Sequence, residues 1–168
     1  MKPHISLLLI IASVGLLCCG CDKVNNKEVP AYYVRLDLSG YGLWNVYGVS
    51  GVGDYRFFDR AKGIPSNFPY NVNTYTGFGG ILLMIGLDIS TGNYGPVAYD
   101  AACPVESQQS VTVGIDNENL NAVCPKCGSR YDVLQGSGTY ISGPAATNRL
   151  GLRIYRVTPN NGGYVITH

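Results

Sequence analysis

The clearest pattern in the chain is an alternation of apolar and polar residues that begins after position 31. The apolar positions are every second residue, namely Tyr32, Val34, Leu36 and Leu38. A period of two is typical of a β-strand with one buried face. Other short apolar stretches, each bounded by turn-forming residues, predict strands over Ile81–Leu87, Val97–Tyr99, Ser110–Ile115, Leu120–Val123, Tyr131–Leu134, Leu152–Val157 and Tyr164–Thr167. No long stretch after residue 20 has helical spacing, so the sequence predicts an all-β fold.

Residues 40–80 are rich in tyrosine, glycine and asparagine and show no clear periodicity. We expect this Tyr/Gly-rich insertion to form one or two hairpins within the domain. Its aromatic side chains have two interpretations, a platform for a ligand or ordinary packing at a sheet edge and over a core. Packing is favoured, because no group of polar residues accompanies the rings.

The N-terminus has the layout of a bacterial secretory signal. Lys2 precedes an apolar run from Ile5 to Leu17, which is too short to span a bilayer comfortably. The run ends in CCGC, which resembles a lipobox, where a signal peptidase cuts before a cysteine that carries lipid. We expect residues 1–20 to be the signal peptide and Cys21 to be lipidated, with Cys18 and Cys19 as alternative positions. An ordinary secretory signal or a membrane anchor is the competing interpretation.

Composition agrees with one exported domain of balanced charge. The segment CDKVNNKEVP, residues 21–30, is polar and unpatterned, as is typical of a flexible tether. Residues 31–168 are enough for a single hydrophobic core. Removal of residues 1–20 takes away one lysine and leaves 11 basic against 11 acidic residues, so no nucleic-acid binding is expected. The predicted location is the bacterial cell envelope, with the membrane contacted through the lipid anchor on the periplasmic or outer surface.

If Cys21 carries the lipid, an odd number of cysteines remains in the rest of the mature chain. Cleavage before Cys21 leaves Cys103, Cys124 and Cys127, and three thiols cannot all pair. In an exported protein this predicts a metal, one disulfide with a free thiol, or an intermolecular bridge. A zinc ribbon would need a second CxxC motif, which the sequence lacks. The spacing therefore offers three soft ligands from two separate loops.

Three stretches of the C-terminal part match one family pattern: VAYDAACPV at 97–105, AVCPKCGSRYD at 122–132 and GSGTYISGPA at 136–145. Together they resemble a Rieske domain, an antiparallel β-sandwich in which two hairpin loops carry C-x-H and C-x-x-H to a [2Fe-2S] cluster. The resemblance implies a metal-loop subdomain over about 97–145. It also implies that Gly143, Pro144 and Ala145 form the proline loop that covers the cluster.

The ligand residues depart from this family pattern. The resemblance places Cys103 and Cys124 at the cysteine positions of the inner iron, and it places Val105 and Cys127 where the outer iron has histidines. Valine has no lone pair, so a standard Rieske cluster cannot form. Glu106, next to the vacant position, is the predicted fourth ligand.

Two other groups compete with Glu106 for that position. His168 and solvent are the alternatives, because the only other histidine, His4, is lost with the signal. With anionic ligands in place of imidazole, the resemblance implies an electron carrier of low potential with a redox partner that the sequence does not identify. Ser129 and Tyr131 stand where respiratory members donate hydrogen bonds to sulfur, although a tight turn and a packed strand residue would explain them equally well.

Two further occupants of the cysteine site compete with the cluster. A disulfide between two of the three thiols would leave a non-redox binding or structural module. Zinc, held by three thiolates and one oxygen or nitrogen, would likewise be structural. A catalytic role in isolation is not expected, because a cysteine nucleophile needs a histidine partner and no phosphate-binding loop is present.

Overall fold

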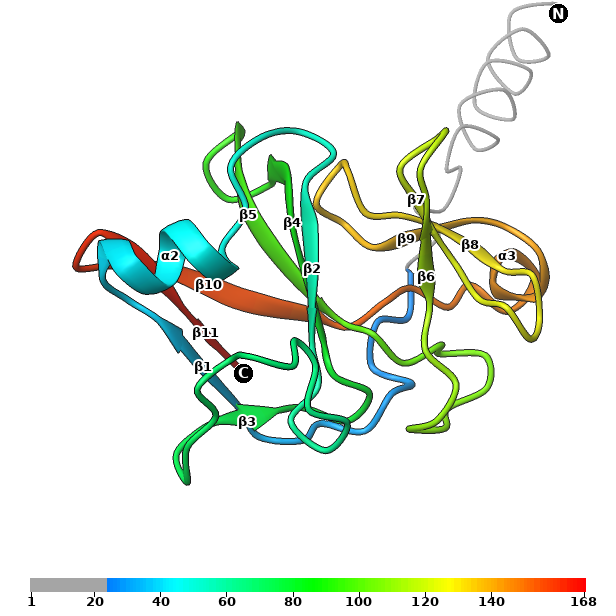
Figure 1. Cartoon of the computed structure of the whole chain (residues 1–168). Helices are drawn as coiled ribbons and strands as arrows, with labels where there is room; N and C mark the ends of the chain where they lie inside the picture. Colours follow the sequence, from blue (N-terminus) through cyan, green and yellow to red (C-terminus); the bar gives the residue numbers. More distant parts are fainter. Residues whose placement is uncertain (1–23) are drawn as a thin grey trace, which may run out of the picture.

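Two antiparallel sheets form the framework of the chain in the computed structural model, which describes residues 24–168. The predicted signal peptide and Cys21 lie outside the described residues. The large sheet has the strand order β2-β4-β5-β10-β11-β1-β3, and the small sheet has the order β6-β7-β8-β9 (Figure 1). The all-β prediction is therefore confirmed.

The elements are short, and no strand of the small sheet is longer than four residues. The large sheet contains β1 (Val34–Leu38), β2 (Tyr55–Phe58), β3 (Tyr75–Thr76), β4 (Ile81–Asp88), β5 (Asn93–Asp100), β10 (Ile154–Asn160) and β11 (Gly163–Thr167). The small sheet contains β6 (Gly114–Asp116), β7 (Asn121–Val123), β8 (Arg130–Asp132) and β9 (Thr139–Ser142). The two helices of the described residues are α2 (Tyr41–Tyr47) and α3 (Pro144–Asn148). Among residues 24–168, no helix has the length and apolar composition needed to cross a bilayer.

Strand β4 lies between two hydrophobic cores because its successive side chains point to opposite faces. Leu82 and Met84 pack against the cysteine loops and the small sheet. Ile81 and Leu83 pack with residues of β1, β2 and β11. All four side chains are fully buried, which explains the continuous apolar run in the sequence. The cysteine loops thus rest on the first of these cores.

Residues 40–80 contain one short hairpin, closed by an antiparallel bridge between Asp59 and Ile64, but the two strands of this region do not pair with each other. Strand β2 pairs with β4, and β3 pairs with β1, so both strands from this region bind distant parts of the chain instead of each other. The region also contains α2, a helix of seven residues that is too short to give a periodic signal. Its aromatic residues include a packed group in which Phe58, Tyr47 and Tyr70 each meet Phe68 edge to face.

The chain from residue 24 to residue 30 lies against the loop that follows α3. Asn25 N donates to Arg149 O at 2.8 Å, and Gly151 N donates to Asn25 O at 2.9 Å. The Asn26 side chain donates to a backbone carbonyl of the next residue in that loop at 2.8 Å. These hydrogen bonds attach the segment to the domain through both its backbone and a side chain.

The end of the same segment is buried. Val29 is 1% exposed, and its carbonyl oxygen accepts a hydrogen bond from Arg153 Nε at 2.9 Å. Arg153 Nη2 also donates to Lys27 O at 3.2 Å. Residues 24–30 therefore do not form the flexible tether that their composition predicts, because backbone carbonyls and two asparagines find partners on the domain. Residues 21–23 lie outside the described residues.

Candidate metal centre

The first cysteine loop, residues 103–111, follows the end of β5. An antiparallel bridge between Ala102 and Thr112 closes its base, and Cys103 N donates to Val111 O at 2.9 Å. Ser107 N donates to Cys103 O at 2.8 Å, which makes a tight turn directly after the cysteine. The loop is therefore a hairpin that carries Cys103 at its start.

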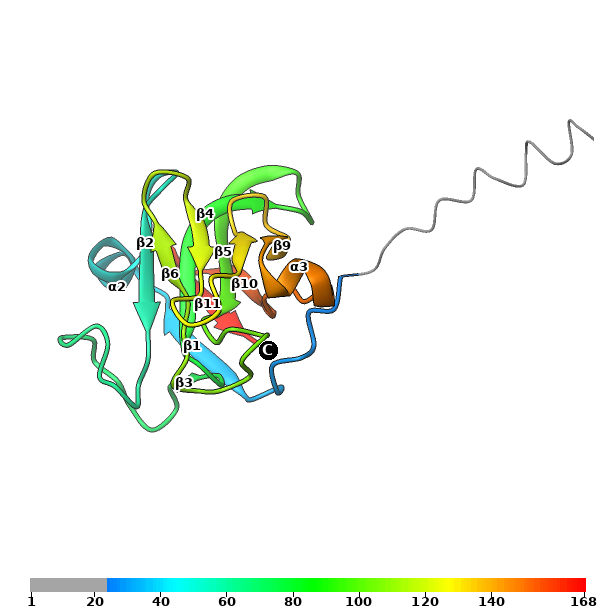
Figure 2. The same cartoon turned by 90° about the vertical axis from the view of Figure 1, so that its right-hand side faces the viewer.

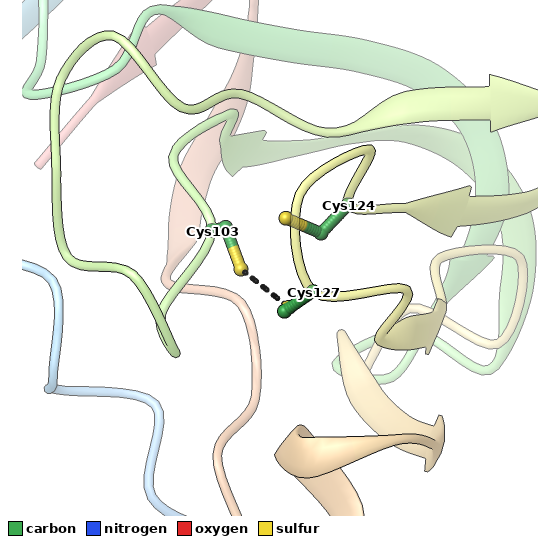
Figure 3. A group of neighbouring side chains, drawn as sticks. All are labelled: Cys103, Cys124 and Cys127. Atoms are coloured by element: carbon green, nitrogen blue, oxygen red, sulfur yellow. Dashed lines mark hydrogen bonds between the residues drawn. The ribbon is translucent and has the colours of Figure 1, made fainter.

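The second cysteine loop, residues 124–129, joins β7 to β8. Cys124 N donates to Ser129 O at 2.9 Å, and Gly128 N donates to Cys124 O at 2.9 Å. Gly128 has a φ of +70°, a conformation that glycine adopts without steric cost. The CPKCG sequence thus folds back on itself, so that both of its cysteines face the first loop, as Figure 3 shows.

The three cysteine sulfurs converge on one point between the two loops (Figure 3). The Sγ atoms of Cys103, Cys124 and Cys127 all lie within 4.8 Å of one another. Cys103 Sγ and Cys127 Sγ are 3.7 Å apart. Cys103 and Cys124 are fully buried, Cys127 is half-buried, and all three are free thiols. The described residues therefore bring together three soft ligands that can bind a metal ion.

Two of these sulfurs form hydrogen bonds with side-chain hydroxyl groups. The Tyr131 hydroxyl lies 3.5 Å from Cys103 Sγ, and either group can be the donor of this hydrogen bond. Cys127 Sγ lies 3.1 Å from Ser129 Oγ, with the thiol as donor. When Cys127 is a thiolate, the hydroxyl becomes the donor of the same bond. Such donors stabilise buried thiolates, which are the form that binds a metal.

Burial and these hydrogen bonds set the acidity of the two thiols. Burial raises the pKa of Cys103 to about 12, although Tyr131 and the loop N–H groups oppose the effect. Burial also opposes ionisation of Cys127, but hydrogen bonds from the Ser129 side chain and backbone outweigh it, so the pKa of Cys127 is below its ordinary value. Cys127 is therefore the thiol that ionises first, and Cys103 ionises at neutral pH only when a cation replaces its proton.

The predicted proline loop covers the second cysteine loop. Ala145 N donates to Ser129 Oγ at 3.1 Å, and Ala145 is fully buried. Gly143 has a φ of +79°, and a Cβ atom there would lie 2.9 Å from the Cα of Ser129. Pro144 opens helix α3 directly after this glycine. Gly143 and Pro144 thus allow the chain to approach Ser129 closely and then turn into α3.

The candidates for a fourth ligand do not join the three sulfurs. Glu106 Oε2 forms an ion pair with Lys126 Nζ at 2.5 Å, which connects the first loop to the second. His168 Nε2 lies 3.1 Å from Arg153 Nη1. Val105 is half-buried and packs against the first core. The group of sulfurs within 4.8 Å includes neither Glu106 nor His168, so each stays a prediction as a ligand.

Asp100 is a site residue that the sequence interpretation missed. Its buried carboxylate accepts hydrogen bonds from Phe78 N at 3.0 Å, from Gly79 N at 3.0 Å and from Ala102 N at 2.8 Å. The Tyr155 hydroxyl donates to the same carboxylate. These bonds fix the backbone immediately before Cys103. The only signal in the sequence is the position of an aspartate at the end of an apolar strand, which does not distinguish it from a surface residue.

Comparison of the sequence with known protein-family models gives no match, and neither does comparison with curated proteins. The resemblance to Rieske domains therefore stays a prediction from the motifs of the two loops. What the structure establishes is coarser: an all-β chain in which two loops place three cysteine sulfurs at one possible metal site.

Proposed function

We propose that the protein is a metal-binding module of the bacterial cell envelope, in which Cys103, Cys124 and Cys127 hold a single divalent metal ion. Zinc is the ion that best suits these ligands, because it prefers thiolates and a tetrahedral arrangement. The observation that carries the proposal is the spacing of the three sulfurs, all within 4.8 Å of one another.

The spacing supports one ion because it matches the edge of a small tetrahedron. A metal–sulfur distance of about 2.3 Å in a tetrahedral site places two sulfur ligands about 3.8 Å apart. The separation of Cys103 Sγ and Cys127 Sγ is 3.7 Å. Both thiolates therefore fit the same ion with little movement.

The fourth coordination position is open to one oxygen ligand. Glu106 is the protein candidate, because its carboxylate lies at the edge of the first loop, but it must leave Lys126 to bind the metal. Water is the alternative, as in zinc sites with three protein ligands. Zinc has no redox chemistry, so the proposed role is binding or structural, with the ion joining the two loops.

Electron transfer by a [2Fe-2S] cluster is the second candidate function. The Ser129 and Tyr131 hydroxyls form hydrogen bonds with cysteine sulfurs. This arrangement favours electron transfer, since a cluster would use the same hydroxyls as hydrogen-bond donors. The sulfur spacing disfavours it. In the Rieske pattern Cys103 and Cys127 would bind different irons at opposite ends of the cluster, whereas their sulfurs lie 3.7 Å apart. With Val105 also unable to bind iron, the residues present do not fit a two-iron cluster.

The proposed location of the protein is the bacterial cell envelope. A lipid on Cys21 would attach the chain to a membrane of the envelope, with the domain on the periplasmic side or at the cell surface. A redox partner is required only for the second candidate function.

Titration of the metal-free mature chain, which begins at the acylated Cys21, with Co²⁺ tests the proposal. Thiolate-to-cobalt charge transfer reports sulfur ligands, and the visible bands report tetrahedral geometry. We expect saturation at one equivalent, with a strong loss of charge transfer in Cys103→Ser, Cys124→Ser and Cys127→Ser. Gln108→Ala, a change at an exposed residue of the first loop, is the matched control. A Cys127→Ser protein that binds cobalt as the parent chain does would contradict a three-thiolate site.

A further inference from the structure

Because residues 24–30 are bound to the domain, a lipid on Cys21 would be connected to the domain by only a few residues. Three residue steps separate Cys21 from Val24, and an extended chain spans at most about 11 Å over that distance. A free tether of residues 21–30 would reach about 30 Å. The described domain of residues 24–168 has an expected radius of gyration of about 15 Å, so only the longer tether would let it turn freely.

The surface next to this short connection is formed by α3 and the residues that follow it. Asn25 forms a parallel bridge with Leu150 and a hydrogen bond with Arg149 O. Figure 2 shows the start of the described chain beside α3, and Figure 1 shows α2 at the other end of the molecule. Thr147 and Arg149 are exposed on this surface. A short anchor at residue 21 would thus hold the α3 end nearest to the membrane.

The metal centre lies at the same end. Helix α3 begins against Ser129 of the second cysteine loop. Ser107 Oγ of the first loop donates to Glu28 O of the bound segment at 3.4 Å. Both cysteine loops are therefore tied to the part of the chain that leads to Cys21.

We propose that the surface of α3 and residues 149–151 lies against the headgroups of a phospholipid membrane, so that the metal centre faces the bilayer. This inference rests on the lipid anchor of the proposed function. The exposed charges beside it, Lys27, Glu28 and Arg149, have mixed signs and give only weak attraction to anionic lipid. The contact is imposed by the length of the connection, so it does not depend on salt.

Fluorescence quenching in vesicles tests this orientation. A fluorescent amino acid is introduced at Thr147 on α3, or at Val46 on α2, which is 64% exposed. Genetic incorporation avoids thiol chemistry at the metal site. The acylated mature protein, which begins at Cys21, is reconstituted in phosphatidylcholine vesicles whose headgroups carry a nitroxide quencher. We expect quenching at Thr147 to be several-fold stronger than at Val46, with no change at high salt.

A longer connection is the control. Insertion of about ten Gly and Ser residues between Asp22 and Lys23 restores a flexible tether, so the difference in quenching between the two probes should disappear. Equal quenching of both probes in a chain whose lipid on Cys21 is confirmed by mass spectrometry would overturn the orientation alone. Absence of lipid on Cys21 would overturn both the orientation and the proposed anchor.

Discussion

At the scale of single residues, the three cysteines differ in environment although they share one site. Cys103 is fully buried and meets the Tyr131 hydroxyl, whereas Cys127 is half-buried and bonded to Ser129. Hydrogen bonding lowers the pKa of Cys127, and burial raises the pKa of Cys103 to about 12. Metal binding must therefore displace a proton from Cys103 at neutral pH, which makes metal affinity increase with pH.

Alkylation of the metal-free protein should follow this order of acidity. Only the thiolate reacts, so iodoacetamide should modify Cys127 with a midpoint below its ordinary thiol pKa, while Cys103 stays protonated and unreactive to a much higher pH. Ser129→Ala removes a hydrogen-bond donor to the Cys127 thiolate, so it should raise the pKa of Cys127 and move the midpoint upward. Peptide mass spectrometry over a pH series measures both rates. Equal modification of Cys103 and Cys127 at neutral pH would contradict the environments described above.

At the scale of elements, the sequence predicted those features that depend on local patterns. The alternation of β1 appears as buried Val34, Leu36 and Leu38, because one face of a strand meets the core. The two cysteine loops lie between antiparallel pairs, as their motifs predict.

Features that depend on distant partners were missed. The pairings of β2 with β4 and of β3 with β1 join segments that are remote in the sequence, and a local sequence pattern does not specify such partners. The attachment of residues 24–30 to the domain and the role of Asp100 were not predicted for the same reason, because their hydrogen-bond partners are remote in the sequence. Polar residues with remote partners are indistinguishable from solvated ones in a single sequence.

Helix α3 and the second cysteine loop should depend on the close approach at Gly143. Gly143→Ala places a Cβ atom 2.9 Å from Ser129 Cα and forces alanine into a positive-φ conformation that residues with a side chain rarely adopt. We expect it to lower the free energy of unfolding by about 1–3 kcal/mol and to weaken cobalt binding. Gly114→Ala is the matched control, because a Cβ there has no neighbour within 4 Å. Denaturant unfolding and cobalt titration measure the effects, and equal behaviour of the two variants would contradict the role of Gly143.

The start of the first cysteine loop should depend on Asp100. In Asp100→Asn one carboxylate oxygen becomes an NH₂ group, which faces backbone N–H donors and loses their hydrogen bonds. Each buried group left without a partner costs about 1–3 kcal/mol, so we expect a clear fall in the denaturant midpoint. Glu118→Gln, the same chemical change at an exposed residue, should have little effect. Equal midpoints for the two variants would show that Asp100 does not hold the loop.

At the scale of the whole molecule, the two sheets have different sources of stability. The large sheet has strands of up to eight residues and an aromatic core. Three strands of the small sheet have only three residues each, and this sheet packs on the core that contains Cys103 and Cys124. A metal ion that joins the two cysteine loops would therefore stabilise the small sheet most.

Removal of the metal should destabilise the small sheet more than the large sheet. A ligand present at about 1,000 times its dissociation constant adds about 4 kcal/mol to the native state, and that contribution is lost on chelation. We expect hydrogen exchange to become faster in β7 and β8, with much smaller changes in β4 and β5. Exchange measured by mass spectrometry with and without chelator provides the comparison. A uniform change across all four strands would contradict a local role for the ion.

Three cysteine thiolates holding one metal ion would give a distinctive set of neighbours around the metal. X-ray absorption at the metal edge, on protein purified anaerobically from its native host, measures this directly. We predict one metal per chain, about three sulfur neighbours at about 2.3 Å and one lighter neighbour. Scattering from a second metal at short range, with two irons and sulfide per chain, would contradict the claim and establish a cluster instead.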